Sequence, residues 1–204
     1  MRTEILALTL ALAIAALLVV PAWAGTPIDE TKPADAKGIV VIDNLIGSIT
    51  VKGWDKNEIQ VTGTLGDGPD RLDFTVDGKK ARVKVVWPDT DNYRDKGDED
   101  TDLTVMVPRG SSVRAEGVNT PIEVSGLNGE LEVSTVNGGM KISGDPSVVE
   151  AQTVNGSIEV DVTAAEVEVE AVNGTIEITG ARGEVSASTV NGDIEVQGAD
   201  FDRG

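Results

Sequence analysis

The sequence predicts an all-β protein: a single-stranded, right-handed parallel β-helix (β-solenoid) with 18-residue coils and irregular N-terminal coils or a cap. Three observations carry this prediction. A Val-Asn pair recurs five times at a constant step of 18 residues, and polar and apolar residues alternate on both sides of it. The composition has 23 Gly, 3% aromatic residues and neither Cys nor His. Such a composition favours turn-rich strands packed by aliphatic side chains.

The repeat holds in several columns of the alignment, not only in one motif. Four of the five Val-Asn pairs continue as Val-Asn-Gly. A single unit cannot bury its apolar face, but a stack of units can. Like residues of successive units then form columns along the stack, with neighbouring coils about 4.8 Å apart. A β-sandwich would not keep a fixed step, and the usual strand crossover predicts a right-handed coil. The clearest apolar columns are Ile122, Met140, Ile158, Ile176, Ile194 and Leu131, Val149, Val167, Val185.

Two other 18-residue solenoids are excluded by the spacing of the columns. A left-handed β-helix needs a hexapeptide period, whereas the apolar columns here are spaced two, seven and two residues apart. A calcium β-roll places Asp two residues after a Gly. That position holds Ile158, Ile176 or Val185 here, so the calcium ligands are missing.

The recurring asparagines predict a structural ladder. An Asn at the same corner of each coil can hydrogen-bond to the Asn above and the Asn below it. We therefore expect a structural role rather than a ligand-binding role for Asn119, Asn137, Asn155, Asn173 and Asn191.

The valine before each asparagine has two open interpretations. If the strand alternates strictly and Asn points inward, the valines point outward and form a candidate partner stripe. If the chain kinks at the corner, the same valines belong to the core. The column comprises Val118, Val136, Val154, Val172 and Val190.

The region over 38–117 is less regular. The segment Gly47–Gly53 resembles the repeat at Gly156–Val160, so a first coil should begin near Ile39, and Glu58–Val61 matches the strand at Glu166–Val169. Further strands are expected over 72–76, 81–86 and 103–107, either as wider coils or as a small capping sheet. The acidic stretch over 89–102 is hydrophilic and therefore predicts a solvated loop. The spacing of its acidic residues does not fit a calcium-binding loop. The regular solenoid is expected over 118–204.

The N-terminus predicts export. Residues 1–24 contain a basic start, a continuous apolar run and an Ala-Trp-Ala site, which together are typical of a secretory signal peptide cleaved after Ala24. The run is short for a spanning helix, so no membrane span is expected after cleavage. Residues 25–37 are polar with two prolines and predict a flexible lead. The mature protein should reside in the periplasm, at the cell surface or outside the cell.

These motifs resemble a known family. The signal peptide, the Gly47–Trp54 segment, the Val107–Gly110 turn and the Val-Asn-Gly units are similar to the bacterial β-strand-repeat "putative adhesin" family of unknown function, related to the head GIN domain of autotransporter adhesins. The resemblance covers about residues 38–198. It implies a single-stranded right-handed β-helix in the envelope or outside the cell, and it carries no catalytic residues to transfer.

Charge and composition narrow the function. A formal net charge of −18 predicts repulsion from nucleic acids. We expect no catalytic residues, no metal site and no cofactor, and a non-catalytic binding, adhesion or scaffold role with an envelope protein or a glycan as partner. The alternatives are a self-assembling structural unit and a polysaccharide-active β-helix enzyme, for which paired carboxylates would suffice. The C-terminal end of the solenoid is a candidate site for homo-oligomerisation, because its last coil has little covering.

Overall fold

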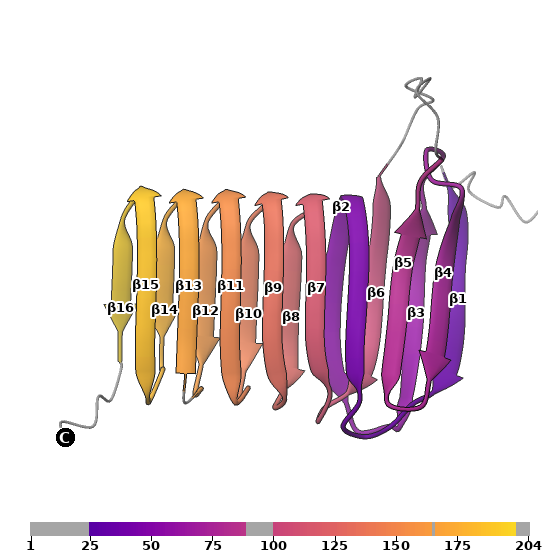
Figure 1. Cartoon of the computed structure of the whole chain (residues 1–204), viewed down its shortest axis with the longest axis horizontal. Helices are drawn as coiled ribbons and strands as arrows, with labels where there is room; N and C mark the ends of the chain where they lie inside the picture. The colour runs from indigo at the N-terminus through magenta and orange to yellow at the C-terminus, as the bar shows by residue number, and fades with distance from the viewer. Residues whose placement is uncertain (1–24, 89–99, 165, 199–204) are drawn as a thin grey trace, which may run out of the picture.

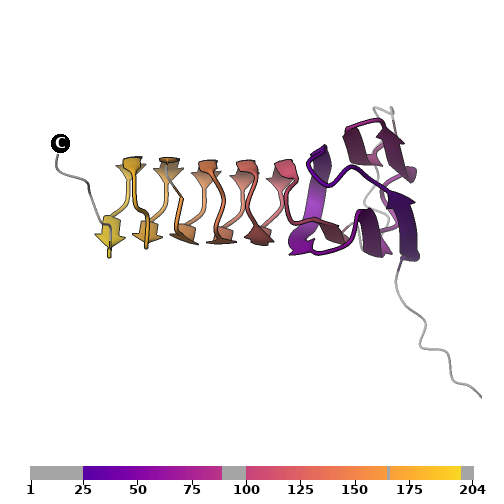
Figure 2. The same ribbon diagram turned by 90° about the horizontal axis from the view of Figure 1, so that it is seen from below.

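The architecture is a flat stack of coils with a cap at one end (Figure 1). The computed structural model describes residues 25–88, 100–164 and 166–198, and these contain sixteen β-strands. The strands of successive coils form two parallel stacks that face each other, as the view from below shows (Figure 2). The predicted all-β parallel solenoid is thus confirmed.

Each regular coil contributes one long and one short strand. Residue pairs between neighbouring coils are 18 apart, such as Val149 with Val167 and Ile158 with Ile176. The long strands are β7 (Ser112–Asn119), β9 (Glu130–Asn137), β11 (Val148–Asn155), β13 (Glu166–Asn173) and β15 (Glu184–Asn191). The short strands are β8 (Ile122–Leu127), β10 (Met140–Gly144), β12 (Ile158–Val162), β14 (Ile176–Thr179) and β16 (Ile194–Gln197). Residues of β7 and β9 also pair at a separation of 18, such as Val113 with Leu131. The regular stack therefore begins a few residues before 118.

The first coil is one continuous strand, β2 (Ile39–Trp54), which belongs to both stacks. Its first half pairs with β7 and its second half with β8. The chain turns between the stacks at Gly47, where φ is +117° and an added Cβ would lie 2.1 Å from the Thr101 carbonyl oxygen. Only glycine fits this corner. The coil predicted to begin near Ile39 therefore begins there.

The core lies between the two stacks and consists of the predicted columns. Ile122, Met140, Ile158 and Ile176 are each at most 3% exposed. Burying such a side chain fully is worth about 1.5–3 kcal/mol, so the columns are the main source of stability. The same column becomes partly exposed in the last coil, where Ile194 is 43% exposed.

The N-terminal region adds β5 (Lys80–Val86) and β6 (Thr101–Pro108) parallel to β2, and further strands pair antiparallel with these two. The hairpin of β4 (Arg71–Asp77) and β5 joins the first half of β2 through β5. On the other stack, β6 pairs with β2, β3 (Glu58–Leu65) pairs with β6, and β1 (Thr26–Pro33) pairs with β3. Both sequence alternatives for this region are present: β5 and β6 extend the two parallel stacks by one rung, as a wider coil would, and β1, β3 and β4 add an antiparallel cap.

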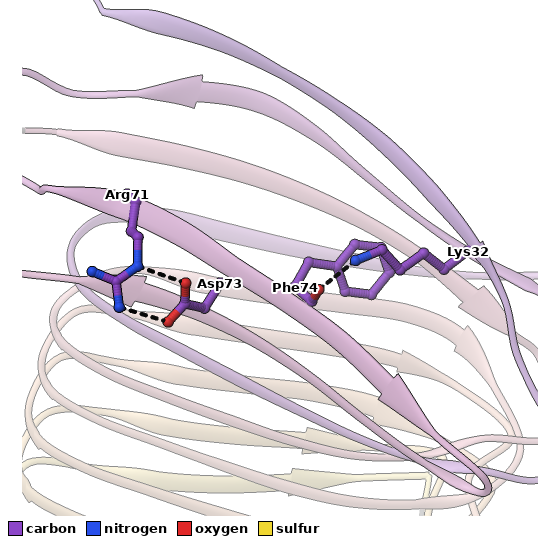
Figure 3. A network of polar contacts seen from close by, with 4 residues as sticks. All are labelled: Lys32, Arg71, Asp73 and Phe74. Carbon is purple, nitrogen blue, oxygen red and sulfur yellow. Dashed lines mark hydrogen bonds and ion pairs between the residues drawn. The ribbon is translucent and has the colours of Figure 1, made fainter.

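Polar contacts tie the two sides of the cap together (Figure 3). Lys32 of β1 donates a hydrogen bond to the Phe74 carbonyl of β4, and its Nζ lies 4.5 Å from the centroid of the Phe74 ring. On β4, Arg71 binds both carboxylate oxygens of Asp73, at 2.8 and 3.2 Å. The Lys32 contact joins β1 on one stack to β4 on the other, whereas the Arg71–Asp73 pair is exposed and lies within β4.

Three expectations for this region need correction. The flexible lead over 25–37 is wrong for Thr26–Pro33, which forms β1 because β3 supplies an edge for backbone pairing. The match of Glu58–Val61 to a solenoid strand is wrong, because β3 pairs antiparallel with β6. Thr101 and Asp102 belong to β6 and not to the acidic loop.

Some predictions fall outside the described residues. These are the signal peptide over 1–24, the rest of the acidic loop over 89–99, and the final residues over 199–204. Among the described residues, no helix is long and apolar enough to cross a membrane.

Candidate functional site

The valine column is an exposed apolar stripe along one edge of the stack. Val136, Val154 and Val172 are each 40% exposed, Val118 is 37% exposed and Val190, in the last coil, is 73% exposed. Of the two interpretations of this column, the structure shows the outward one. In β9, β11 and β13 the residue before each valine is buried, such as Thr135 at 5% exposure.

Leu45 extends the stripe by one rung and was missed by the sequence analysis. Asn44 pairs with Gly117 and Ile46 with Asn119, so Leu45 lies beside Val118. It is 45% exposed. Its strand lacks the Val-Asn motif, and only its place two residues before Gly47 could have indicated its position. We call the row of Leu45, Val118, Val136, Val154, Val172 and Val190 the apolar stripe.

The asparagines form a continuous hydrogen-bonded row beside the apolar stripe. Each Asn donates from Nδ2 to the Oδ1 of the Asn one coil earlier, at 2.8 or 2.9 Å, from Asn137 to Asn191. The side chains are exposed and do not point inward, because the strand ends at this position and the chain bends. Each amide keeps one N–H and one oxygen lone pair for other partners.

Inward-facing threonines, of which Thr135 and Thr153 are buried, hold the corner on its inner side. Thr135 donates from Oγ1 to the Thr120 carbonyl at 3.0 Å, and Thr153 and Thr189 donate to the Gly138 and Gly174 carbonyls at 3.2 and 3.1 Å. The sequence analysis treated this column only as small residues. The hydroxyl explains why three of its members are Thr, and Ala171 is the rung without this bond.

The glycine of the Val-Asn-Gly motif is required by close approach of the preceding coil. A Cβ added at Gly174 would lie 1.9 Å from the Gly156 carbonyl oxygen, and one at Gly156 would lie 2.0 Å from that of Gly138. The corner of each coil therefore packs directly on the corner before it, which brings the stripe residues into a straight row.

Two shallow hollows run beside the apolar stripe. One, of about 390 Å³, follows its C-terminal part and is lined by Ser134, Gln152, Glu170 and Ser188 together with the valines. The other, of about 580 Å³, adjoins Leu45 and Val118 and is lined by Trp87, Arg82 and Lys84. Both include Gly117, so the two hollows meet at one point along the stripe.

The sheet faces away from the stripe are acidic. Glu132, Glu150 and Glu168 form one outward column, and Glu123, Lys141, Glu159, Glu177 and Glu195 form another. The Glu159 carboxylate accepts a hydrogen bond from Lys141 at 2.7 Å. This bond, and then the charge of Glu159, raise the pKa of Lys141 above its usual value. Among the described residues, no group of three acidic side chains is arranged to hold a metal ion.

The chain was compared with known proteins. No family model and no curated protein matches it. Solved structures do. A putative adhesin from Bacteroides fragilis aligns over 86% of this chain and 96% of its own, at 13% identity and a TM-score of 0.48. A putative cell adhesion protein from Clostridium sporogenes aligns over 84% and 99%, at 12% identity and 0.49.

A third structure, named as a putative lipid binding protein from Parabacteroides distasonis, aligns over 88% of this chain and 98% of its own. Its identity is 12% and its TM-score 0.30. At these identities and scores, the likeness does not identify what this chain binds.

Proposed function

We propose that this protein is an exported, non-catalytic protein of the cell envelope that binds another envelope protein along its apolar stripe. The observation that carries the proposal is the stripe itself: six aliphatic side chains, each 37–73% exposed, in one straight row. Monomeric proteins rarely leave a continuous apolar row uncovered unless it is a binding surface.

The surroundings of the stripe support a protein partner. The acidic columns keep charge on the broad faces, whereas the stripe is bordered mainly by amides, glycines and hydroxyls. The charged residues that line the adjoining hollows are Asp43, Arg82, Lys84, Glu116 and Glu170. An apolar centre with a polar rim is the usual anatomy of a protein interface. A glycan is the alternative partner, and the free N–H and lone pair of each ladder Asn are the groups that would bind it.

The arrangement of the carboxylates supports a non-catalytic role. The glutamates of the regular coils stand in columns on open sheet faces, such as Glu150 beside Glu168. Glycoside hydrolysis needs two carboxylates on opposite sides of a bound sugar. Columns on a flat face do not provide that geometry.

The test is cross-linking in the cells that make the protein, followed by mass spectrometry. The stripe variant carries Val136→Ser, Val154→Ser and Val172→Ser. The matched control carries Glu132→Gln, Glu150→Gln and Glu168→Gln on the same three strands. We expect one envelope protein to be captured by the wild type and the control and to be lost from the stripe variant. Capture of the same proteins by all three would contradict the proposal.

Export has its own test. Amino-terminal sequencing of the protein recovered from outside the cytoplasm should begin at Gly25. A product that keeps residues 1–24, or one found only in the cytoplasm, would overturn this part of the proposal. We also propose a second copy of the chain as a partner, at the C-terminal end of the solenoid.

A further inference from the structure

The two ends of the stack are protected to different degrees. At the N-terminal end, the outer strand β1 has Pro27 as its second residue and Pro33 as its last, and neither has a backbone N–H to offer. The other outer strand, β4, has its Phe74 carbonyl bonded by Lys32 (Figure 3). Proline, lysine and charged side chains are the usual means by which proteins block an open sheet edge.

The C-terminal end has fewer of these means among its described residues, where each outer strand keeps one charged side chain, Glu184 on β15 and Glu195 on β16. The strands β15 and β16 are the last members of the two stacks (Figure 1), and neither contains proline or lysine. Each therefore presents a row of backbone N–H and C=O groups without a strand partner. Core side chains are also uncovered, since Ile194 and Val196 are 43% and 40% exposed whereas Ile176 and Ile178 are fully buried.

The acidic columns change at this end. Glu168 is followed by Ser186 in its column, and Glu170 is followed by Ser188. The outer face of β15 thus keeps Glu184 as its one acid, where β13 has three: Glu166, Glu168 and Glu170. Acidic side chains would repel a like strand from another copy. The end rung has Ser186 where the interior coils have Glu132, Glu150 and Glu168, and it has Ser188 in a column that is already neutral at Ser134 and Gln152.

From these observations we infer that the C-terminal end of the solenoid is a docking surface for a second copy of the same chain. The copies are related by a twofold axis perpendicular to the sheets, and β15 pairs antiparallel with its counterpart. Any twofold end-to-end contact must be antiparallel here, because the axis reverses one strand relative to the strand it meets. Such a contact uses the same surface on both copies, so the assembly closes as a dimer and does not grow into a fibre.

A pairing centred on Ala187 satisfies both sheets. This pairing sets Ser186 opposite Ser188 of the second copy. It also keeps Glu184, the acid of β15, away from Glu184 of the second copy. In the other stack, a pairing centred on Val196 sets Glu195 opposite Gln197 of the second copy. The core columns then continue from one copy into the other, which covers Ile194 and Val196. The contact area is small, so we expect a dissociation constant in the micromolar range or weaker.

The first experiment measures association directly. Sedimentation velocity of the protein as purified from cells, over a broad concentration range, should show a reversible monomer–dimer equilibrium and no larger species. The variant with Ser186→Glu and Ser188→Glu restores the acids that β13 carries at the same positions, so its coil should fold. We expect it to weaken dimerisation at least about 10-fold, because it places like charges opposite each other. The control Ser134→Glu, in the column of Ser188 but in an interior coil, should leave dimerisation unchanged.

Disulfide trapping tests the geometry, and the lack of native cysteine removes any background. An equimolar mixture of the Ser186→Cys and Ser188→Cys variants should form covalent dimers under mild oxidation. The Ser134→Cys variant should not. Dimers that form equally well with Ser134→Cys would overturn the inference.

Two further outcomes would also overturn it. One is a wild-type protein that stays monomeric at millimolar concentration. The other is a monomeric full chain whose truncation after Gly198 causes dimerisation, because the chain's own final residues would then be the occupant of the edge. Neither outcome bears on the apolar stripe, so failure here is distinguishable from failure of the proposed function.

Discussion

Asn155 donates a side-chain hydrogen bond to Asn137, one coil earlier, at 2.8 Å, and accepts one from Asn173, one coil later, at 2.9 Å. The ladder thus gives an interior asparagine two bonds and the terminal Asn191 one. The ladder also marks the border between the apolar stripe and the glycine corner.

The first prediction concerns this difference. Asn155→Ala removes two exposed ladder bonds and should lower the free energy of unfolding by about 1 kcal/mol. Asn191→Ala removes one bond and should cost about half as much. Urea denaturation followed by circular dichroism measures both. Equal losses for the two variants would show that the ladder does not contribute bond by bond.

The second prediction concerns the corner glycine. Gly174→Ala places a Cβ against the Gly156 carbonyl and should destabilise the protein by about 1–3 kcal/mol, since neighbouring backbone must move. Gly139→Ala is the matched control, because the nearest atom to its Cβ would be 3.4 Å away. The control should melt close to the wild type. Similar melting temperatures for both variants would contradict the close approach of the coils.

The third prediction concerns charge. Lys141 stands in a column of glutamates, so Lys141→Gln should lower the melting temperature, and more so at low ionic strength. Lys37→Gln, which removes the same charge outside the column, should have a smaller effect. The wild type should itself melt higher as salt is raised, because the acidic columns repel less. A melting temperature that does not change with salt would contradict this account.

The raised pKa of Lys141 adds a dependence on pH. A cation whose pKa is higher in the folded state contributes stability below its unfolded value, near 10.5, and loses it as pH rises through the folded value. The difference in melting temperature between wild type and Lys141→Gln should therefore persist from neutral pH to about pH 10 and shrink above it. A difference that stays constant to higher pH would assign the effect to packing of the lysine chain.

The fourth prediction compares an interior rung with the last one. Ile176 is fully buried, so Ile176→Ala should cost about 2–5 kcal/mol. Ile194 has the same place in the last coil but is 43% exposed, so Ile194→Ala should cost less in the monomer. Denaturation at low protein concentration measures this difference. Equal costs at that concentration would mean that Ile194 is already covered within one chain.

Sequence patterns predicted the regular coils because each residue there has a counterpart 18 positions away. Ile158 and Ile176 could be assigned to one buried column before any coordinates were known. The orientation of Val154 could not, because alternation within one strand does not show where the chain bends. The position of Leu45 was also hidden, since its rung carries Leu-Ile in place of Val-Asn.

The cap was harder to predict because its strands depend on their partners. Thr26–Pro33 has little alternation and two prolines, and it becomes a strand because β3 offers a free edge. Ile59 and Val61 alternate as a solenoid strand does, but a period of two is the same for parallel and antiparallel pairing. Long-range pairing, and not local preference, determines the structure of this region.

Because the repeat has a constant step of 18 residues, the number of coils can change without changing the residues at the two ends of the solenoid. Each interior coil repeats the contacts of its neighbours, so deleting or duplicating one unit would move the two ends by one rung, about 4.8 Å, and leave both intact. The solenoid can therefore serve as an adjustable spacer, whose reach evolves in fixed increments while the surfaces at its two ends remain unchanged.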